Sequence, residues 1–232
     1  MVISKTDIMK RQLIYVIVFT FLTGCLLWSC TNNSKKNQHT EVTVPDVKVK
    51  EENTPHHCRL LMQPYDGFSE ARALSVAEEL KKTLATYVKD PVVIEVKVLP
   101  VKPLTKNLMN KAKTRHRADK ILDMQENLKS QKDDMIIGLT DKDISASAHG
   151  YEDWGVIGLS NTGQSNSVLS TFRVKDKTQF WKVVLHEFGH AFLGLPHCPN
   201  DDPHCFMKDC KGKPDLSKER YLCNSCSNHI HL

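Results

Sequence analysis

The sequence predicts an α+β domain in which helices pack on a mixed, twisted sheet. Two observations support this fold class. From about residue 57, apolar segments with the periods of strands and helices alternate along the chain, and two short apolar runs joined by a polar turn precede the last helix. The length of 232 residues fits one domain with additional segments, so we expect residues 57–232 to form that domain.

The first three elements of this domain have clear boundaries. Residues 58–65 form a short apolar run around Pro64, which is typical of a strand. Residues 69–88 begin at a serine and repeat apolar side chains with a helical period. Those apolar side chains are Ala73, Leu74, Val76, Ala77, Leu80, Leu84 and Val88. Residues 91–100 are rich in β-branched side chains and end at a proline, which predicts a second strand.

The later elements complete the alternation. Residues 101–116 are basic and irregular, and residues 117–130 predict a helix with a charged, solvated face. Its apolar side is expected to contain Ile121, Leu122, Met124 and Leu128. Residues 134–140 predict a buried strand, and residues 155–160 and 167–174 predict a strand pair.

The composition is that of an ordinary globular protein. Hydrophobic residues make up 40% and charged residues 25% of the chain. The net charge of +5 is small and comes largely from lysine-rich stretches, so it does not indicate nucleic acid as a partner. We expect a monomer that binds no nucleic acid.

The N-terminus has the pattern of an export signal. Lys5, Lys10 and Arg11 precede an apolar run over residues 13–28. That run is shorter than the ~20 residues that a transmembrane helix needs. It ends in LLWSC, and LTGC occurs inside it; both resemble the lipobox of bacterial lipoproteins, in which the cysteine is acylated.

Two cysteines compete for the lipidated position. The chain becomes polar directly after Cys30, as a tether should, whereas apolar residues follow Cys25. We therefore predict a signal peptide over residues 1–30, lipidation at Cys30 and a flexible linker over residues 31–56. This predicts a membrane-anchored lipoprotein of a bacterial cell envelope, or a secreted protein if no lipid is attached. An uncleaved signal anchor is the alternative.

A well-delimited helix carries the most informative motif. Asp176 or Thr178 can cap a helix over residues 179–193. Gly194 ends it, and Pro196 follows two residues later.

That helix predicts a metal site. His186 and His190 are four residues apart, so they lie on one helix face, about 6 Å apart along the axis. Both can bind one tetrahedral ion, and His197 can return after the turn as a third ligand. Glu187 lies about 100° around the helix, where it can reach a water without binding the metal. Three ligands leave a fourth position for water, the arrangement of a catalytic zinc.

The remaining histidines show no ligand spacing, and we expect them to be surface or core residues. They are His56, His57, His116, His149, His204, His229 and His231. Only His204 is close enough in sequence to the motif to remain a candidate.

Five cysteines follow the histidine motif, while Cys58 stands alone before it. The five are Cys198, Cys205, Cys210, Cys223 and Cys226. The C-x-x-C at 223–226 can hold a metal, and with two further cysteines it would make a four-sulfur zinc site closed to water. Disulfides are the alternative in an exported protein.

At these residues the sequence resembles the archaemetzincins, a family of metzincin metallopeptidases. The shared pattern is H-E-x-x-H-x-x-G-x-x-H-C, followed by C-x-M and C-x-x-C. The matching residues are His186, Glu187, His190, Gly194, His197, Cys198, Cys205, Met207, Cys223 and Cys226. The resemblance extends over about residues 57–227 and leaves the predicted signal outside.

The cysteine spacing departs from the family pattern in two places. Six residues instead of four separate Cys198 from Cys205, and 15 instead of 17 separate Met207 from Cys223. The two changes cancel, so Cys198 and Cys223 are 25 positions apart in both. Cys210 could replace Cys205, but we prefer Cys205 because it precedes the methionine by two positions, as in the family.

The resemblance implies a metzincin-like fold with a small zinc-knuckle subdomain at its C-terminus, and two zinc ions. Catalytic zinc would be bound by His186, His190 and His197, and structural zinc by Cys198, Cys205, Cys223 and Cys226. Glu187 would be the general base and Met207 the residue of the Met-turn beneath the metal. Asp209 stands where some metzincins have a metal-binding tyrosine, so we predict no tyrosine switch.

These features predict a zinc peptidase that acts on peptides or proteins. The strand pair between residues 155 and 174 could offer an edge to an extended substrate. A zinc-bearing binding or scaffold lipoprotein with little peptidase activity is the alternative, although the presence of Glu187 argues against it. A secreted protein cross-linked by disulfides is a third hypothesis.

Overall fold

The computed structural model describes most of the domain. The described ranges are 56–88, 92–131, 134–211 and 215–230. The predicted signal peptide with Cys25 and Cys30, and the predicted linker up to residue 55, lie outside the described residues. Among the helices of the described ranges, none is long and apolar enough to span a membrane.

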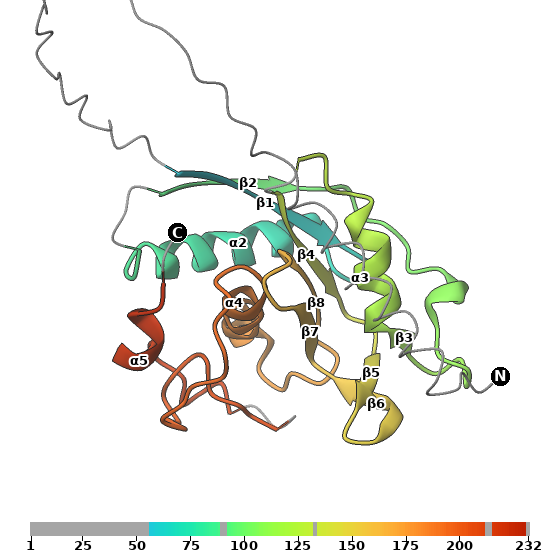
Figure 1. Cartoon of the computed structure of the whole chain (residues 1–232). Helices are drawn as coiled ribbons and strands as arrows, with labels where there is room; N and C mark the ends of the chain where they lie inside the picture. The colour runs from blue at the N-terminus through green and yellow to red at the C-terminus, as the bar shows by residue number, and fades with distance from the viewer. Residues whose placement is uncertain (1–55, 89–91, 132–133, 212–214, 231–232) are drawn as a thin grey trace, which may run out of the picture. The chain divides into compact units, whose positions relative to one another are not determined.

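A five-stranded sheet forms the centre of the domain (Figure 1). Its strands are β1 (His56–Pro64), β2 (Val92–Val98), β4 (Asp134–Thr140), β7 (Gly158–Asn161) and β8 (Asn166–Ser170). Their spatial order is β2-β1-β4-β8-β7. The first four strands are parallel, and β7 lies antiparallel to β8 at the edge. The predicted mixed sheet is confirmed.

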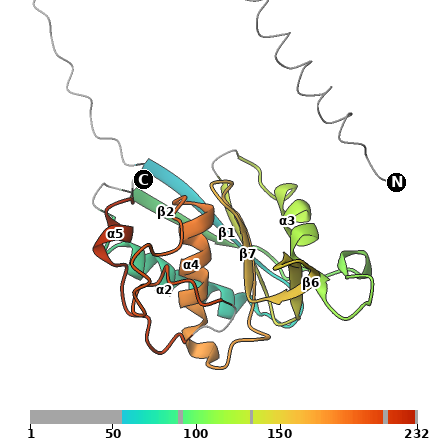
Figure 2. The same ribbon diagram turned by 60° about the horizontal axis from the view of Figure 1, so that its bottom comes forward.

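Helices cover both faces of this sheet. They are α2 (Glu70–Leu84), α3 (Ala118–Glu126) and α4 (Phe180–Ala191). The short α5 (Asn224–Ser227) lies apart from the sheet in the C-terminal segment (Figure 1). In Figures 1 and 2, α2 and α4 pack together on one face and α3 lies on the other. Alternate residues of β4 therefore face different helices: Ile137 packs in the core with α2 and α4, while Gly138 faces α3. This explains why every residue of β4 is buried.

The structure corrects the predicted apolar side of α3. Ile121 and Leu122 are buried as expected, but Met124 is only partly buried and Gln125 is fully buried. The Gln125 amide donates hydrogen bonds to Asn166 Oδ1 (2.7 Å) and to the carbonyl of Ser167 (2.9 Å). A polar side chain is tolerated there because its donors are satisfied. Leu128 lies beyond the end of α3 and is also only partly buried.

A second, smaller sheet was not predicted. It consists of β3 (His116–Arg117), β5 (Ile144–Ala148) and β6 (Tyr151–Val156), in the order β3-β5-β6. Gly155 and Val156 were expected to begin the strand pair, but they pair with Ser145 and Ile144 of β5. The pair itself is β7 and β8, and it ends at Ser170.

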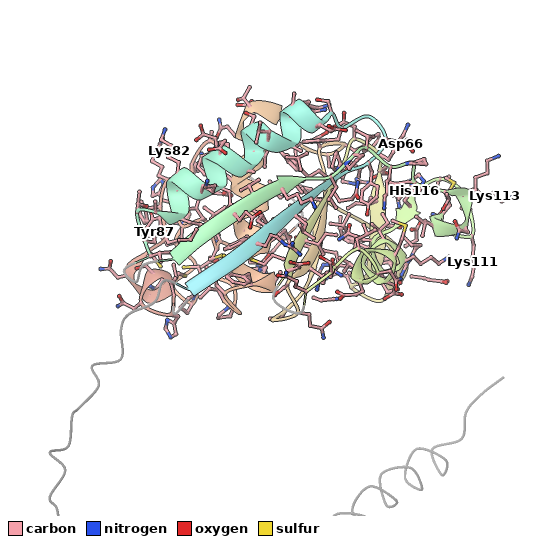
Figure 3. The ribbon with its side chains drawn as sticks, turned by 90° about the horizontal axis from the view of Figure 1, so that it is seen from above. Asp66, Lys82, Tyr87, Lys111, Lys113 and His116 are labelled. Carbon is pink, nitrogen blue, oxygen red and sulfur yellow. The ribbon has the colours of Figure 1, made fainter. Side chains whose placement is uncertain are left out.

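The C-terminal segment docks beside the end of α2. The backbone N–H of Leu222 donates to the Tyr87 hydroxyl at 3.0 Å. Figure 3 shows Tyr87 just beyond the end of α2, whereas Lys111 and Lys113 of the basic segment extend from the opposite end of the domain. The segment that carries the last two cysteines is thus held against the main body of the fold.

Candidate active site

The helix that carries the histidine motif is held at both ends. The Asp176 carboxylate accepts a hydrogen bond from the backbone N–H of Thr178 at 3.0 Å, which caps a 3-10 turn leading into α4. The helix ends at Ala191, two residues earlier than predicted. Gly194 then adopts a φ of +63°, where glycine is favoured, and the N–H of Leu195 bonds back to the Gly189 carbonyl at 2.9 Å. The chain therefore reverses just before His197.

The three histidines converge on one point. The Nε2 atoms of His186 and His190 are 3.0 Å apart, and His197 brings a ring nitrogen within 4.8 Å of both rings' donor atoms. Two nitrogens bound to a tetrahedral zinc lie roughly 3.3 Å apart. The spacing therefore fits a single zinc ion.

Backbone carbonyls fix the orientation of the two helical imidazoles. His186 Nδ1 donates to the carbonyl of Phe206 (2.8 Å), and His190 Nδ1 donates to that of Leu195 (2.6 Å). Since a carbonyl can only accept, each Nδ1 carries the proton and each Nε2 keeps its lone pair for a metal. Burial, with His190 nearby, lowers the pKa of His186 to about 4, so its ring is neutral at neutral pH, as a ligand must be.

Glu187 lies beside the triad, between α4 and the edge strand β7. The Ser160 hydroxyl donates a hydrogen bond to Glu187 Oε2. A Cβ atom on Gly158 would lie 2.8 Å from Glu187 Oε1, so a side chain there would displace the carboxylate. Burial raises the pKa of Glu187, and the Ser160 hydrogen bond opposes that rise. A carboxylate held in this way can exchange a proton with a nearby water.

Met207 packs against α4 at Gly189, the residue before His190. It is fully buried, and a Cβ atom on Gly189 of α4 would lie only 2.5 Å from its sulfur. The glycine in the HEFGH motif therefore makes room for this side chain. The Met207 carbonyl also accepts a hydrogen bond from the N–H of Cys198 at 2.7 Å, which links the two donor clusters.

Four cysteines form a second donor cluster. The sulfur atoms of Cys198 and Cys223 are 3.6 Å apart, and Cys226 lies 3.7 Å from both Cys205 and Cys223. A disulfide would bring two sulfurs to about 2.05 Å, whereas four thiolates around a zinc ion are separated by roughly 3.8 Å. The geometry fits a tetrahedral metal and not a pair of disulfides.

Burial favours the protonated thiol at two of these cysteines. Burial raises the pKa of the Cys205 thiol to about 11, and it raises the pKa of Cys226 as well. Thiols in such surroundings become thiolates when a metal ion supplies the compensating charge. Three of the four cysteines are buried, and Cys223 is half-buried.

The other candidates lie elsewhere. Cys210 Sγ lies 3.6 Å from Glu219 Oε1, outside the four-cysteine cluster, so the structure brings Cys205 and not Cys210 to that point. Cys58 is buried in the core next to α2 and α4. His204 Nδ1 donates to the Lys218 carbonyl (2.8 Å) and joins neither cluster.

A cleft of about 310 Å³ opens above the histidines. His186, Glu187 and His197 line it together with residues that the sequence did not single out. Those residues include His149, Trp154, Gly158, Leu216 and Glu219. His149 had been expected to be an ordinary surface or core residue, and no local spacing marks it. The cleft gives a polar ligand access to the triad and to Glu187.

Comparison with known proteins assigns the family. Residues 56–232 match the sequence profile of peptidase family M54. The archaemetzincin of Nanoarchaeum equitans is 33% identical over 101 residues, which are 43% of this chain and 54% of the relative. The archaemetzincin of Haloarcula marismortui is 30% identical over 131 residues, which are 50% of this chain and 70% of the relative. The aligned segment spans about half the length of the first relative and more of the second.

Solved structures share the fold. The archaemetzincin from Methanopyrus kandleri superimposes with a TM-score of 0.60 at 23% identity, over 78% of this chain and 96% of that one. The archaemetzincin from Archaeoglobus fulgidus, solved with malonate, gives 0.54 at 26% identity, over 74% and 99%. The chain belongs to peptidase family M54, and it resembles the archaemetzincins.

Proposed function

We propose that His186, His190 and His197 bind the catalytic zinc of a peptidase and that Glu187 is its general base. The observation that carries this proposal is the convergence of three imidazoles, two of them oriented by backbone carbonyls, beside a half-buried carboxylate. Three protein ligands would leave a fourth position of a zinc ion for water, and His186, His197 and Glu187 line the cleft.

A zinc ion at this site would lower the pKa of a bound water and polarise the substrate carbonyl. Glu187 accepts the proton of the attacking water and passes it to the leaving amine. Ser160 holds the Glu187 carboxylate in position for both transfers. The edge strand β7 can pair with an extended peptide and align its backbone over the histidines.

We further infer that Cys198, Cys205, Cys223 and Cys226 bind a second, structural zinc. Their sulfur spacings support a closed four-thiolate site, in which α5 and the C-x-x-C form a zinc knuckle. The metzincin-like detail of the fold, with Met207 as the residue of the Met-turn, is part of the same proposal.

For the N-terminal segment we propose lipidation at Cys30 and anchoring of the domain to a bacterial membrane by a linker. The support is the charged and apolar signal pattern that ends in LLWSC. Replacement of Cys30 by alanine should move the protein from the membrane fraction to the soluble fraction. Persistence in the membrane fraction, with no change in labelling by a fatty-acid probe, would contradict this proposal.

The function is tested with zinc stoichiometry and peptide hydrolysis on the full chain. We expect two zinc ions per chain, and one in His190→Ala. Glu187→Ala should keep both ions while hydrolysis falls by about 10²- to 10⁴-fold, because only the general base is removed. Glu78→Ala, an exposed carboxylate on α2, is the matched control and should retain full activity.

The outcomes separate the peptidase from its rival. Hydrolysis by Glu187→Ala at the wild-type rate would contradict the proposed base. A wild-type protein with two zinc ions that binds peptides without cleaving any of them would instead support a zinc-bearing binding or scaffold lipoprotein.

A further inference from the structure

The cleft extends beyond the histidines to a wall that the proposed mechanism does not use. Val183 lies three residues before His186 on α4, about 4.5 Å earlier along the helix axis. Facing the cleft beside it are Leu216, Glu219 and Cys210 of the C-terminal segment. This wall is therefore one helical turn from the reacting centre, within reach of a substrate side chain next to the scissile bond.

Glu219 is unusual within this wall. It is only 5% exposed, yet its carboxylate has no ion-pair partner among the described residues. Within the same residues its one side-chain hydrogen bond comes from the Cys210 thiol, a weak donor at 3.6 Å. Burial raises the pKa of Glu219 to about 7, and the Cys210 thiol and the nearby charge of Lys182 only partly oppose this. A buried carboxyl group with so little compensation favours an external cation or donor.

The charge of Lys182 attracts the Glu219 carboxylate, but its ammonium hydrogen-bonds to other groups. Its ammonium donates to the backbone carbonyls of Leu216 (2.6 Å) and Glu219 (2.7 Å) and to Gln179 Oε1 (2.9 Å). These bonds hold the C-terminal segment against α4. Lys182 thus fixes the position of the wall while the Glu219 carboxylate remains available to the cleft.

Charged side chains of both signs line this end of the cleft. The Lys208 ammonium is paired with the Asp201 carboxylate. Asp209 also lines the cleft, and its carboxylate accepts a hydrogen bond from the N–H of Lys211 at 2.8 Å. Lys211 itself is exposed at the rim.

We propose that Glu219 is a specificity-determining residue that selects a lysine or arginine side chain adjacent to the scissile bond. The methylene stem of that side chain would pack on Val183 and Leu216, and its cation would pair with the Glu219 carboxylate. Arrival of a cation would favour the ionised carboxylate, so a basic side chain is stabilised relative to a neutral one of the same shape. This inference rests on the proposed peptidase function and names its substrate class.

The test uses the zinc-loaded full chain. A peptide mixture that presents every residue type on both sides of each bond locates the cleavage sites by mass spectrometry. Two matched peptides, with lysine or the isosteric neutral norleucine at the selected position, then give kcat/KM. We expect a lysine-to-norleucine ratio of at least about tenfold in the wild type and a ratio near one in Glu219→Gln. Asp215→Asn, a nearby exposed carboxylate, should keep the wild-type ratio.

Comparison of the two peptides within each variant removes the effect of a general loss of activity. No preference for lysine or arginine in the wild type, or an unchanged ratio in Glu219→Gln, would overturn the inference. A preference for glutamine over lysine would do the same, since it would indicate a neutral Glu219 that acts only as a hydrogen-bond partner.

A binding experiment distinguishes this inference from the proposed function. In the Glu187→Ala chain, calorimetry should show the lysine peptide binding at least about tenfold more tightly than the norleucine peptide. If the wild type cleaves no peptide but this difference in affinity is found, the lysine-selecting pocket is supported and the proposed peptidase function is rejected. Equal affinities, or no binding of either peptide, would reject the pocket whatever the hydrolysis data show.

Discussion

The two donor clusters meet at adjacent residues, His197 and Cys198, yet they differ in almost every physical respect. The histidine cluster has three donors, two of them on one turn of α4, and His197 is exposed. The cysteine cluster has four donors from three separate segments of the chain, and three of the four are buried. Four donors complete a tetrahedron, whereas three leave a position for water. The contrast teaches that donor count and burial, more than proximity, distinguish the proposed catalytic site from the proposed structural one.

The clusters also differ in how their positions are maintained. Two of the histidines are oriented by carbonyls of the neighbouring turn and of Phe206. The cysteines are brought together by the path of residues 198–226, whose later part is held by Tyr87 and Lys182. The hydrogen bond from Cys198 N–H to the Met207 carbonyl lies between the clusters. We therefore expect damage to the cysteine cluster to reach the histidines, and damage to the histidines to remain local.

The largest effect is expected from Cys226→Ala. Removing one thiolate opens the closed site, and loss of its metal should cost about 5 kcal/mol or more of folding free energy. For a domain of this size that corresponds to a fall in Tm of roughly 10 to 20 °C. Thermal unfolding and zinc content measure it.

Cys210→Ala is the matched control for Cys226→Ala, because Cys210 lies outside the cluster. It should keep two zinc ions and a Tm within a few degrees of the wild type. Equal losses of zinc in the two variants would show that Cys210, and not the cluster geometry, governs the structural site.

An intermediate effect is expected from Cys198→Ser, which tests the link between the clusters. The serine variant keeps the backbone N–H that donates to the Met207 carbonyl, but it removes one thiolate from the four-cysteine cluster next to His197. We expect zinc affinity at the histidines, or kcat/KM, to fall by about 10- to 100-fold, as for the loss of an outer partner of a ligand. Full activity with only one zinc ion per chain would show that the histidine site does not depend on the cysteine cluster.

The smallest effect is expected from Ser160→Ala, which alters a contact beside the histidine cluster and none at the cysteine cluster. Loss of the hydrogen bond to Glu187 should lower kcat/KM about tenfold, since a hydrogen bond to a charged group contributes about 1.5 kcal/mol or more. Both zinc ions and the Tm should be retained. A loss of zinc in this variant would contradict the separation of the two clusters.

Local patterns allowed most of the fold to be predicted. The alternating segments gave β1, α2, β2, α3 and β4 in the correct order, because strand and helix periods are properties of neighbouring residues. The small sheet of β3, β5 and β6 escaped prediction. Its ladder pairs Ile144 with Val156 and His116 with Ile144, and the apolar pattern of these short strands is weak.

The sequence alone determined the histidine triad and Glu187, since their relation is set by the pitch of one helix and the turn after Gly194. It left open whether Cys205 or Cys210 joins the four-cysteine cluster, and it gave no sign of Ser160, Gly158 or Glu219. Only the tertiary structure decided those positions, because each depends on contacts between segments far apart in the chain. Helix geometry relates residues that are only a few positions apart. Strand β7, and the segment that Lys182 holds against α4, lie beside the site only when the whole domain has folded.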